Sequence, residues 1–112
     1  MKSCIPVPII IALHKLGEDI NDARRRRRIT MKLLAERANI SLVTLSRVQK
    51  GDPGTSIGAY AAVLFSLGMI GRLSDLADAA HDLTGRALEE ERLPERVRIA
   101  KQRKAGDERD EE

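Results

Sequence analysis

Residues 30–51 carry polar, small and apolar residues at intervals that suit two short helices joined by a tight turn. Thr30 and Ser41 have side chains that can cap helix N-termini, so each can begin a helix. Ala35 is small enough for two helix backbones to approach closely, and Asn39 tolerates the left-handed conformation of a tight turn. The apolar residues that would hold the helices together are Leu34, Ala38, Ile40, Leu45 and Val48. The spacing predicts a helix-turn-helix unit, and the alternative is an ordinary helical hairpin.

The segments on either side of this unit also have helical spacing. One further helix is predicted from apolar periodicity to begin at residue 8 and to end within the arginine run 24–28. The others span residues 57–67, 72–80 and 84–91. In residues 72–80 we expect Leu73, Leu76 and Ala77 to point inward. Aromatic residues make up only 2% of the chain, which disfavours a sheet. We therefore expect an all-α fold.

The chain is short enough for one compact domain, and its composition changes near the C-terminus. We expect residues 1–7 to form a lead-in and residues 8–91 to form the domain with its dimerisation helices. From Lys101 onward nearly every residue is charged or small, so no apolar periodicity remains to offset the entropy of ordering the chain. Residues 92–112 are therefore predicted to be a charged, flexible tail.

The charges are unevenly distributed along the chain. From Lys15 to Lys50 there are ten basic and four acidic residues, a net charge of +6. From Asp52 to Glu112 there are nine basic and thirteen acidic residues, a net charge of −4. The first half suits a polyanion such as nucleic acid, although an arginine-rich helix can also be simply a solvated face.

The N-terminal apolar run and the single cysteine bear on localisation. Ile5–Leu13 is too short to span a bilayer and contains Pro6 and Pro8, so we expect no membrane partner. Cys4 is the only cysteine and cannot form an internal disulfide, which favours a reducing cytoplasm.

The residues whose side chains could take part in catalysis or metal binding do not form a recognisable catalytic or metal-binding pattern. His14 and His81 have no nearby nucleophile or paired carboxylate in the sequence. Gly51, Gly54 and Gly58 superficially suggest a phosphate loop, but no strand precedes them and no Gly-Lys-Ser/Thr follows. We expect no catalytic residue, no metal and no cofactor.

Two parts of the chain resemble known families. Residues 29–41 (Ile-Thr-Met-Lys-Leu-Leu-Ala-Glu-Arg-Ala-Asn-Ile-Ser) and 45–51 (Leu-Ser-Arg-Val-Gln-Lys-Gly) resemble the Xre/Cro family. Residues 51–56 and 89–98 look like its HipB-type antitoxin branch. The resemblance implies a compact five-helix Cro/repressor-like domain that binds double-stranded DNA.

The Xre/Cro resemblance also implies which residues meet DNA. It places the helix over residues 41–50 in the major groove, with Leu42, Val43 and Arg47 facing base edges. Arg24 and the helix N-terminus that follows Thr30 would contact the DNA backbone. The residues that would hold phosphates or nearby edges are Ser41, Thr44, Ser46 and Lys50.

The chain departs from the Xre/Cro pattern at three positions. Met31 stands where the family usually has a glutamine that reaches a phosphate, so that contact is expected to be missing. Gln49 replaces the common glutamate that pairs with the arginine of the first helix, which is expected to leave Arg24 freer to meet DNA. Asn39 replaces glycine, and asparagine also accepts a left-handed backbone.

The helix predicted over residues 57–67 is apolar nearly all round. Such a helix in a small domain is expected to bury one face in the core and another against a second copy of the chain. The candidates for this dimer contact are Tyr60, Leu64 and Leu67.

The expected function is that of a homodimeric repressor of a palindromic operator that also restrains a HipA-like kinase, as the antitoxin resemblance implies. The segment Leu83–Ile99 could dock on that kinase or pack on the protein's own core or dimer mate. Its apolar anchors are Leu83, Leu88, Leu93, Val97 and Ile99. Two other classes remain open: a stand-alone regulator that answers a small ligand, and an enzyme-inhibiting module that binds DNA weakly or not at all.

Overall fold

The computed structural model describes residues 4–91, and within this range it contains helices and no strand. The all-α class is therefore confirmed. The chain divides between Leu73 and Ser74 into two compact units. The first unit holds α1 (Val7–Arg26), α2 (Met31–Ala38), α3 (Leu42–Gln49), α4 (Ile57–Ser66) and all but the last residue of α5 (Ile70–Ser74). The second holds a 3₁₀ turn (Ala79–His81) and a helix over residues 83–91.

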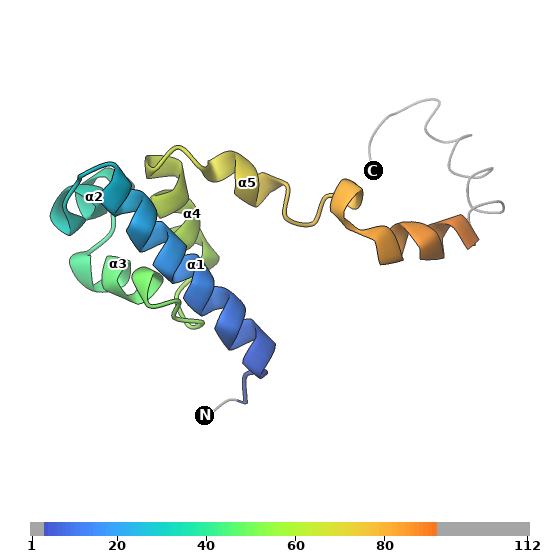
Figure 1. The fold of residues 1–112 in the computed structure, drawn as a ribbon. Helices are drawn as coiled ribbons and strands as arrows, with labels where there is room; N and C mark the ends of the chain where they lie inside the picture. The colour runs from blue at the N-terminus through green and yellow to red at the C-terminus, as the bar shows by residue number, and fades with distance from the viewer. Residues whose placement is uncertain (1–3, 92–112) are drawn as a thin grey trace. The chain divides into compact units, whose positions relative to one another are not determined.

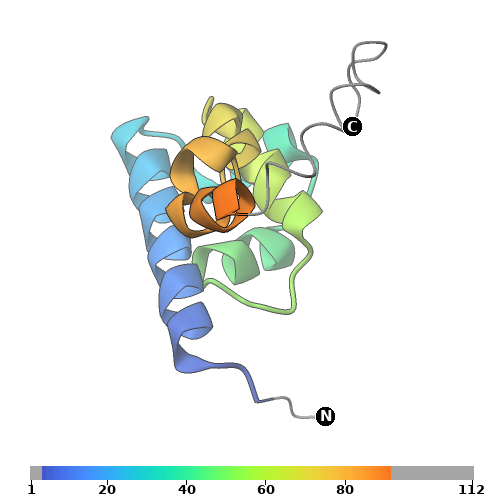
Figure 2. The same ribbon diagram turned by 90° about the vertical axis from the view of Figure 1, so that its right-hand side faces the viewer.

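The long α1 lies along one side of the cluster formed by α2, α3 and α4 (Figures 1 and 2). Two glycines allow α1 and the end of α3 to touch backbone to backbone. A Cβ at Gly17 would lie 2.5 Å from the carbonyl oxygen of Gln49. Gly51 has a φ of 73°, and a Cβ there would collide with the carbonyl of Leu13. The position of α3 against α1 therefore depends on both glycines.

The two-helix unit predicted over residues 30–51 is present as α2, a turn and α3. The Thr30 hydroxyl accepts the backbone N–H of Leu33 at 3.0 Å. The Ser41 hydroxyl accepts the N–H of Thr44 at the same distance, so both helices begin at the predicted caps. Asn39 ends α2 with φ 58° and ψ 43°, the left-handed conformation expected of it.

The core of the first unit draws at least one fully buried aliphatic side chain from each of α1 to α4. These side chains are Ile20, Leu34, Leu45, Val48 and Val63. Burying each one contributes about 1.5–3 kcal/mol. This core holds α3 by one face only, because Leu45 and Val48 lie on the same side of that helix.

The prediction of a helix over residues 72–80 is wrong in its extent, because α5 ends at Ser74. Residues 75–77 form a turn after α5, and the Leu76 side chain is 71% exposed rather than pointing inward. The physical reason is local competition by Asp78, whose carboxylate accepts the N–H of Ala80 at 2.8 Å and caps a new 3₁₀ turn. Ala77 is exposed too, whereas Leu73 packs partly against the core.

The first helix ends at Arg26, within the arginine run where its end was predicted. Arg28 has a left-handed φ of 55°, which turns the chain toward α2. No helix within residues 4–91 is both long and apolar enough to cross a membrane. The tail predicted for residues 92–112 lies outside the described residues.

Candidate nucleic-acid interface

The outer face of α3 is exposed, as the sequence predicts. Leu42 and Val43 are 49% and 60% exposed, although both are large apolar residues. Arg47 and Lys50 are exposed near the other end of the helix. A short helix with one buried face thus presents two apolar side chains and two cations outward.

The polar residues at the start of α3 serve partly as caps. Ser41 is exposed, and its hydroxyl donates to the Thr44 hydroxyl at 3.0 Å in addition to accepting the Thr44 N–H. Thr44 and Ser46 are half-buried. All three hydroxyls predicted to meet DNA therefore lie on α3 or its cap, with Ser41 the most open of them.

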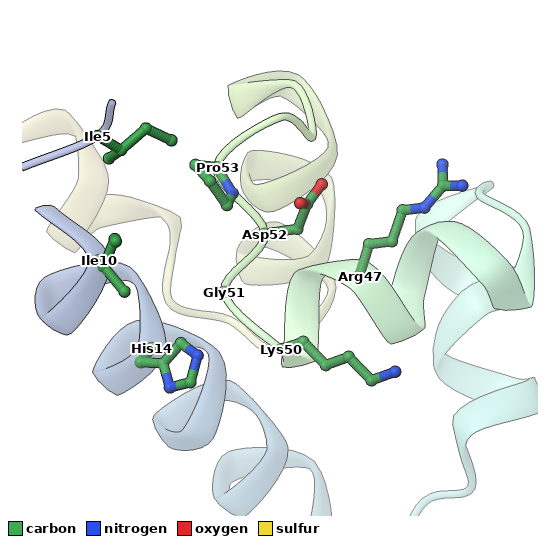
Figure 3. A pocket seen from close by; sticks show the side chains of 8 residues that line it. All are labelled: Ile5, Ile10, His14, Arg47, Lys50, Gly51, Asp52 and Pro53. Carbon is green, nitrogen blue, oxygen red and sulfur yellow. The ribbon is translucent and has the colours of Figure 1, made fainter. Parts of the chain in front are cut away.

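The two cations of α3 border a hollow of about 330 Å³ between the start of α1 and the turn that follows α3. Figure 3 shows Ile10, His14 and Pro53 on one side of it, while the side chains of Arg47 and Lys50 point away on the other. The residues that line it are Ile5, Ile10, His14, Arg47, Lys50, Gly51, Asp52 and Pro53. The cations are therefore turned toward solvent rather than into the hollow.

The turn between α3 and α4 is held by side-chain hydrogen bonds. The Tyr60 hydroxyl donates to the carbonyl oxygen of Asp52 at 2.8 Å, and the Thr55 hydroxyl donates to the Asp52 carboxylate at 2.6 Å. Burial raises the pKa of Tyr60 above its ordinary value, and the nearby Asp52 charge raises it further. These bonds fix the chain immediately after Lys50.

Arg24 is half-buried and its guanidinium is hydrogen-bonded within the protein, whereas we expected it to be freer to meet DNA. Its guanidinium donates to the carbonyl of Ile29 and to the Asn21 side chain, both at 2.9 Å. Its Nε is buried without a partner in the described part of the chain. Gln49 still reaches α1, because its amide donates to the same Asn21 oxygen at 2.6 Å. Sequence reasoning missed Asn21, although it lies one helical turn before Arg24 on the same face.

Met31 is half-buried and packs against the core of the first unit. This placement accounts for an apolar residue at the start of α2. Thr30 is exposed, but its hydroxyl is engaged as the α2 cap.

The three residues expected to face a dimer partner lie in the core instead. Tyr60, Leu64 and Leu67 are only 5%, 7% and 3% exposed, because α2 and α3 pack against α4. The outward apolar residues of α4 are Ile57 and Phe65, each 70% exposed. Their spacing of eight residues places them on one face of the helix.

A metal-binding group of histidine, cysteine, aspartate or glutamate is absent from residues 4–91. Cys4 is exposed and unbonded. Comparisons of the chain with protein-family models, with curated proteins and with solved structures return no match.

Proposed function

We propose that this protein is a sequence-specific, double-stranded-DNA-binding repressor of the helix-turn-helix type. The observation that carries the proposal is the division of α3 into a buried face and an exposed face. The exposed side holds Leu42, Val43, Arg47 and Lys50, and α3 contains no acidic residue that would repel a phosphate. A helix of this width fits the major groove of B-DNA, which is about 12 Å wide.

Each exposed residue of α3 has a defined role in this proposal. Arg47 can donate a bidentate pair of hydrogen bonds to guanine, which discriminates against the other bases. Leu42 and Val43 offer apolar contact that suits thymine methyl groups. Lys50 and the hydroxyls of α3 contact backbone phosphates, which position the helix without reading sequence.

The repressor acts as a homodimer on a palindromic operator. One reading helix covers only a few base pairs, so a second copy is needed for operator-level affinity, with half-site centres roughly 34 Å apart. Tyr60, Leu64 and Leu67 are buried, so the dimer contact is instead the exposed apolar face of α4, which holds Ile57 and Phe65. Removing these side chains from water favours association.

Footprinting on the DNA upstream of the protein's own gene tests the proposal. Two protected half-sites one helical turn apart, with weak binding to random duplex of equal length, are the expected result. Equal affinity for operator and random DNA would contradict sequence-specific repression, and a single non-palindromic half-site would contradict the dimer.

The second partner in the proposal is a HipA-like kinase, and its support is the resemblance of residues 51–56 and 89–98 to HipB-type antitoxins. Leu83 and Leu88 add to this support, because both are exposed on the helix over residues 83–91. The other anchors, Leu93, Val97 and Ile99, lie outside the described residues. Co-purification with a kinase encoded by the adjacent gene is the test, and truncation after Arg92 should weaken kinase binding while DNA binding largely survives.

A further inference from the structure

Five consecutive arginines, Arg24 to Arg28, end α1 and lead into α2, and the structure gives them different surroundings. Arg24 is turned inward, as described above. Arg27 donates to the carbonyl of Ala23 at 2.9 Å and so caps the end of the helix. Arg25, Arg26 and Arg28 are exposed, and no carboxylate among residues 4–91 lies within ion-pairing distance of them. These three guanidinium groups are therefore close in the sequence, and none has an anionic partner within the described residues.

The end of a helix does not by itself require this much positive charge. A cation in the last turn stabilises a helix by interacting with its carbonyl dipole, typically by about 0.3–1 kcal/mol. Arg27 already bonds to one of those carbonyls. Additional cations on neighbouring residues repel one another, and that repulsion is relieved when a polyanion binds. The remaining arginines are thus suited to an external anion.

The position of these arginines relative to α3 indicates which anion they bind. Asn21 of α1 is hydrogen-bonded to Gln49, the last residue of α3. Arg25 follows Asn21 by four residues, so it lies on the same face of α1 about 6 Å farther along the axis. The DNA backbones that border the major groove run on either side of a helix lying in it. Arg25 therefore lies on the side of α1 that meets α3, and Arg28 follows three residues later, beyond the end of the helix.

We infer that Arg25, Arg26 and Arg28 bind the phosphates of the DNA strand that flanks the groove entered by α3. The inference rests on the proposed function, because it requires α3 to lie in the groove. Arginine is suited to this contact since its planar guanidinium donates paired hydrogen bonds to phosphate oxygens. The patch supplies affinity that does not depend on base sequence.

The test compares two double variants of the full-length protein that remove the same charge. Arg25→Gln with Arg28→Gln removes two of the three charges of the patch, and Arg72→Gln with Arg86→Gln removes two exposed arginines elsewhere. Operator affinity is measured from about 50 to 200 mM salt, where each lost phosphate contact lowers the slope of log K against log salt by about 0.9. The patch variant should lose nearly two units of slope and bind operator and random DNA more weakly by the same factor. The control variant should keep the wild-type slope.

Three results would overturn the inference. An unchanged slope in the patch variant, with wild-type protein still protecting its operator, would remove the patch from the interface and leave the proposed function intact. A loss confined to the operator would assign the patch to base reading. Tighter binding by the patch variant would show that acidic residues of the chain itself, such as those in 107–112, occupy the arginines. Failure of wild-type protein to bind the operator would instead refute the proposed function, and matching thermal unfolding of all variants excludes misfolding.

Discussion

Gln49 at the end of α3 donates a hydrogen bond to the Asn21 side-chain oxygen of α1 over 2.6 Å. The same oxygen accepts a hydrogen bond from Arg24 at 2.9 Å. A neutral amide thus occupies the place where an acidic residue of α3 would pair with the arginine directly. The two helices are connected through one acceptor, and the arginine is hydrogen-bonded to the same oxygen.

Replacing Asn21 should show how much this shared acceptor stabilises the fold. Asn21→Ala leaves the half-buried groups of Arg24 and Gln49 without their partner, so the free energy of unfolding should fall by about 1–3 kcal/mol. Asn21→Asp keeps an acceptor of the same shape and adds a charge that attracts Arg24, so it should retain stability or raise it. Urea denaturation of both variants measures the difference. Equal losses in the two variants would argue against the shared acceptor.

The backbone contact between α1 and α3 predicts that alanine lowers stability at Gly17 but not at Gly71. Gly17→Ala places a Cβ 2.5 Å from the Gln49 carbonyl, and the forced separation of the helices should cost about 1–3 kcal/mol despite alanine's better helix propensity. Gly71→Ala in α5 meets no atom within 4 Å and should be neutral or stabilising by up to about 1 kcal/mol. Thermal unfolding compares them. A Gly17→Ala variant as stable as wild type would contradict the close approach.

The raised pKa of Tyr60 predicts a loss of folding stability at alkaline pH. Its pKa in the folded protein is raised by burial and by Asp52, so folding favours the protonated phenol. The stabilisation is complete below the ordinary tyrosine pKa of 10.0 and is lost as pH rises through the higher folded-state value. Tyr60→Phe removes the hydrogen bond to Asp52, so its free energy of unfolding at neutral pH should be about 0.5–1.5 kcal/mol lower than that of wild type. Its unfolding free energy should then decline less than that of wild type above pH 10.

Arg47 and Lys50 should differ in what they contribute to DNA binding. Arg47→Ala should lose about 1–3 kcal/mol of operator affinity and relax the preference at one base pair. Lys50→Ala should weaken binding to all sequences alike and reduce the salt slope by about one unit. Titrations with operator and single-base variants separate the two outcomes. The assignment of Arg47 fails if its substitution lowers affinity for random DNA as much as for operator.

Neighbouring residues of α4 should separate dimerisation from folding. Phe65→Lys alters a side chain that is 70% exposed, so the protein should stay folded but self-associate more weakly. Leu64→Lys places a charge at a position that is only 7% exposed, and the unpaired ion should destabilise the fold itself. Sedimentation and circular dichroism distinguish a folded monomer from an unfolded chain. A Phe65→Lys variant that remains a stable dimer would place the interface elsewhere.

Much of the α2–α3 unit was predictable because its signals are local. Thr30 and Ser41 cap backbone groups three residues away, and Asn39 adopts its left-handed conformation within its own residue. The exposed side of α3, with Leu42, Val43 and Arg47, follows from the helical period once Leu45 and Val48 are taken as buried. These features of the candidate site belong to the sequence by itself.

Only the tertiary structure decided the contact between Gln49 and Asn21 and the buried face of α4. Gln49 meets Asn21 across 28 residues, a contact that no local pattern encodes, whereas both hydrogen-bond partners of Arg24 are close to it in the sequence. In α4 both faces are apolar, so periodicity alone could not choose between Leu64 and Phe65, and the packing of α2 and α3 made the choice. Caps and turns are set by neighbouring residues, whereas the faces of an evenly apolar helix are set by the distant segments that cover them.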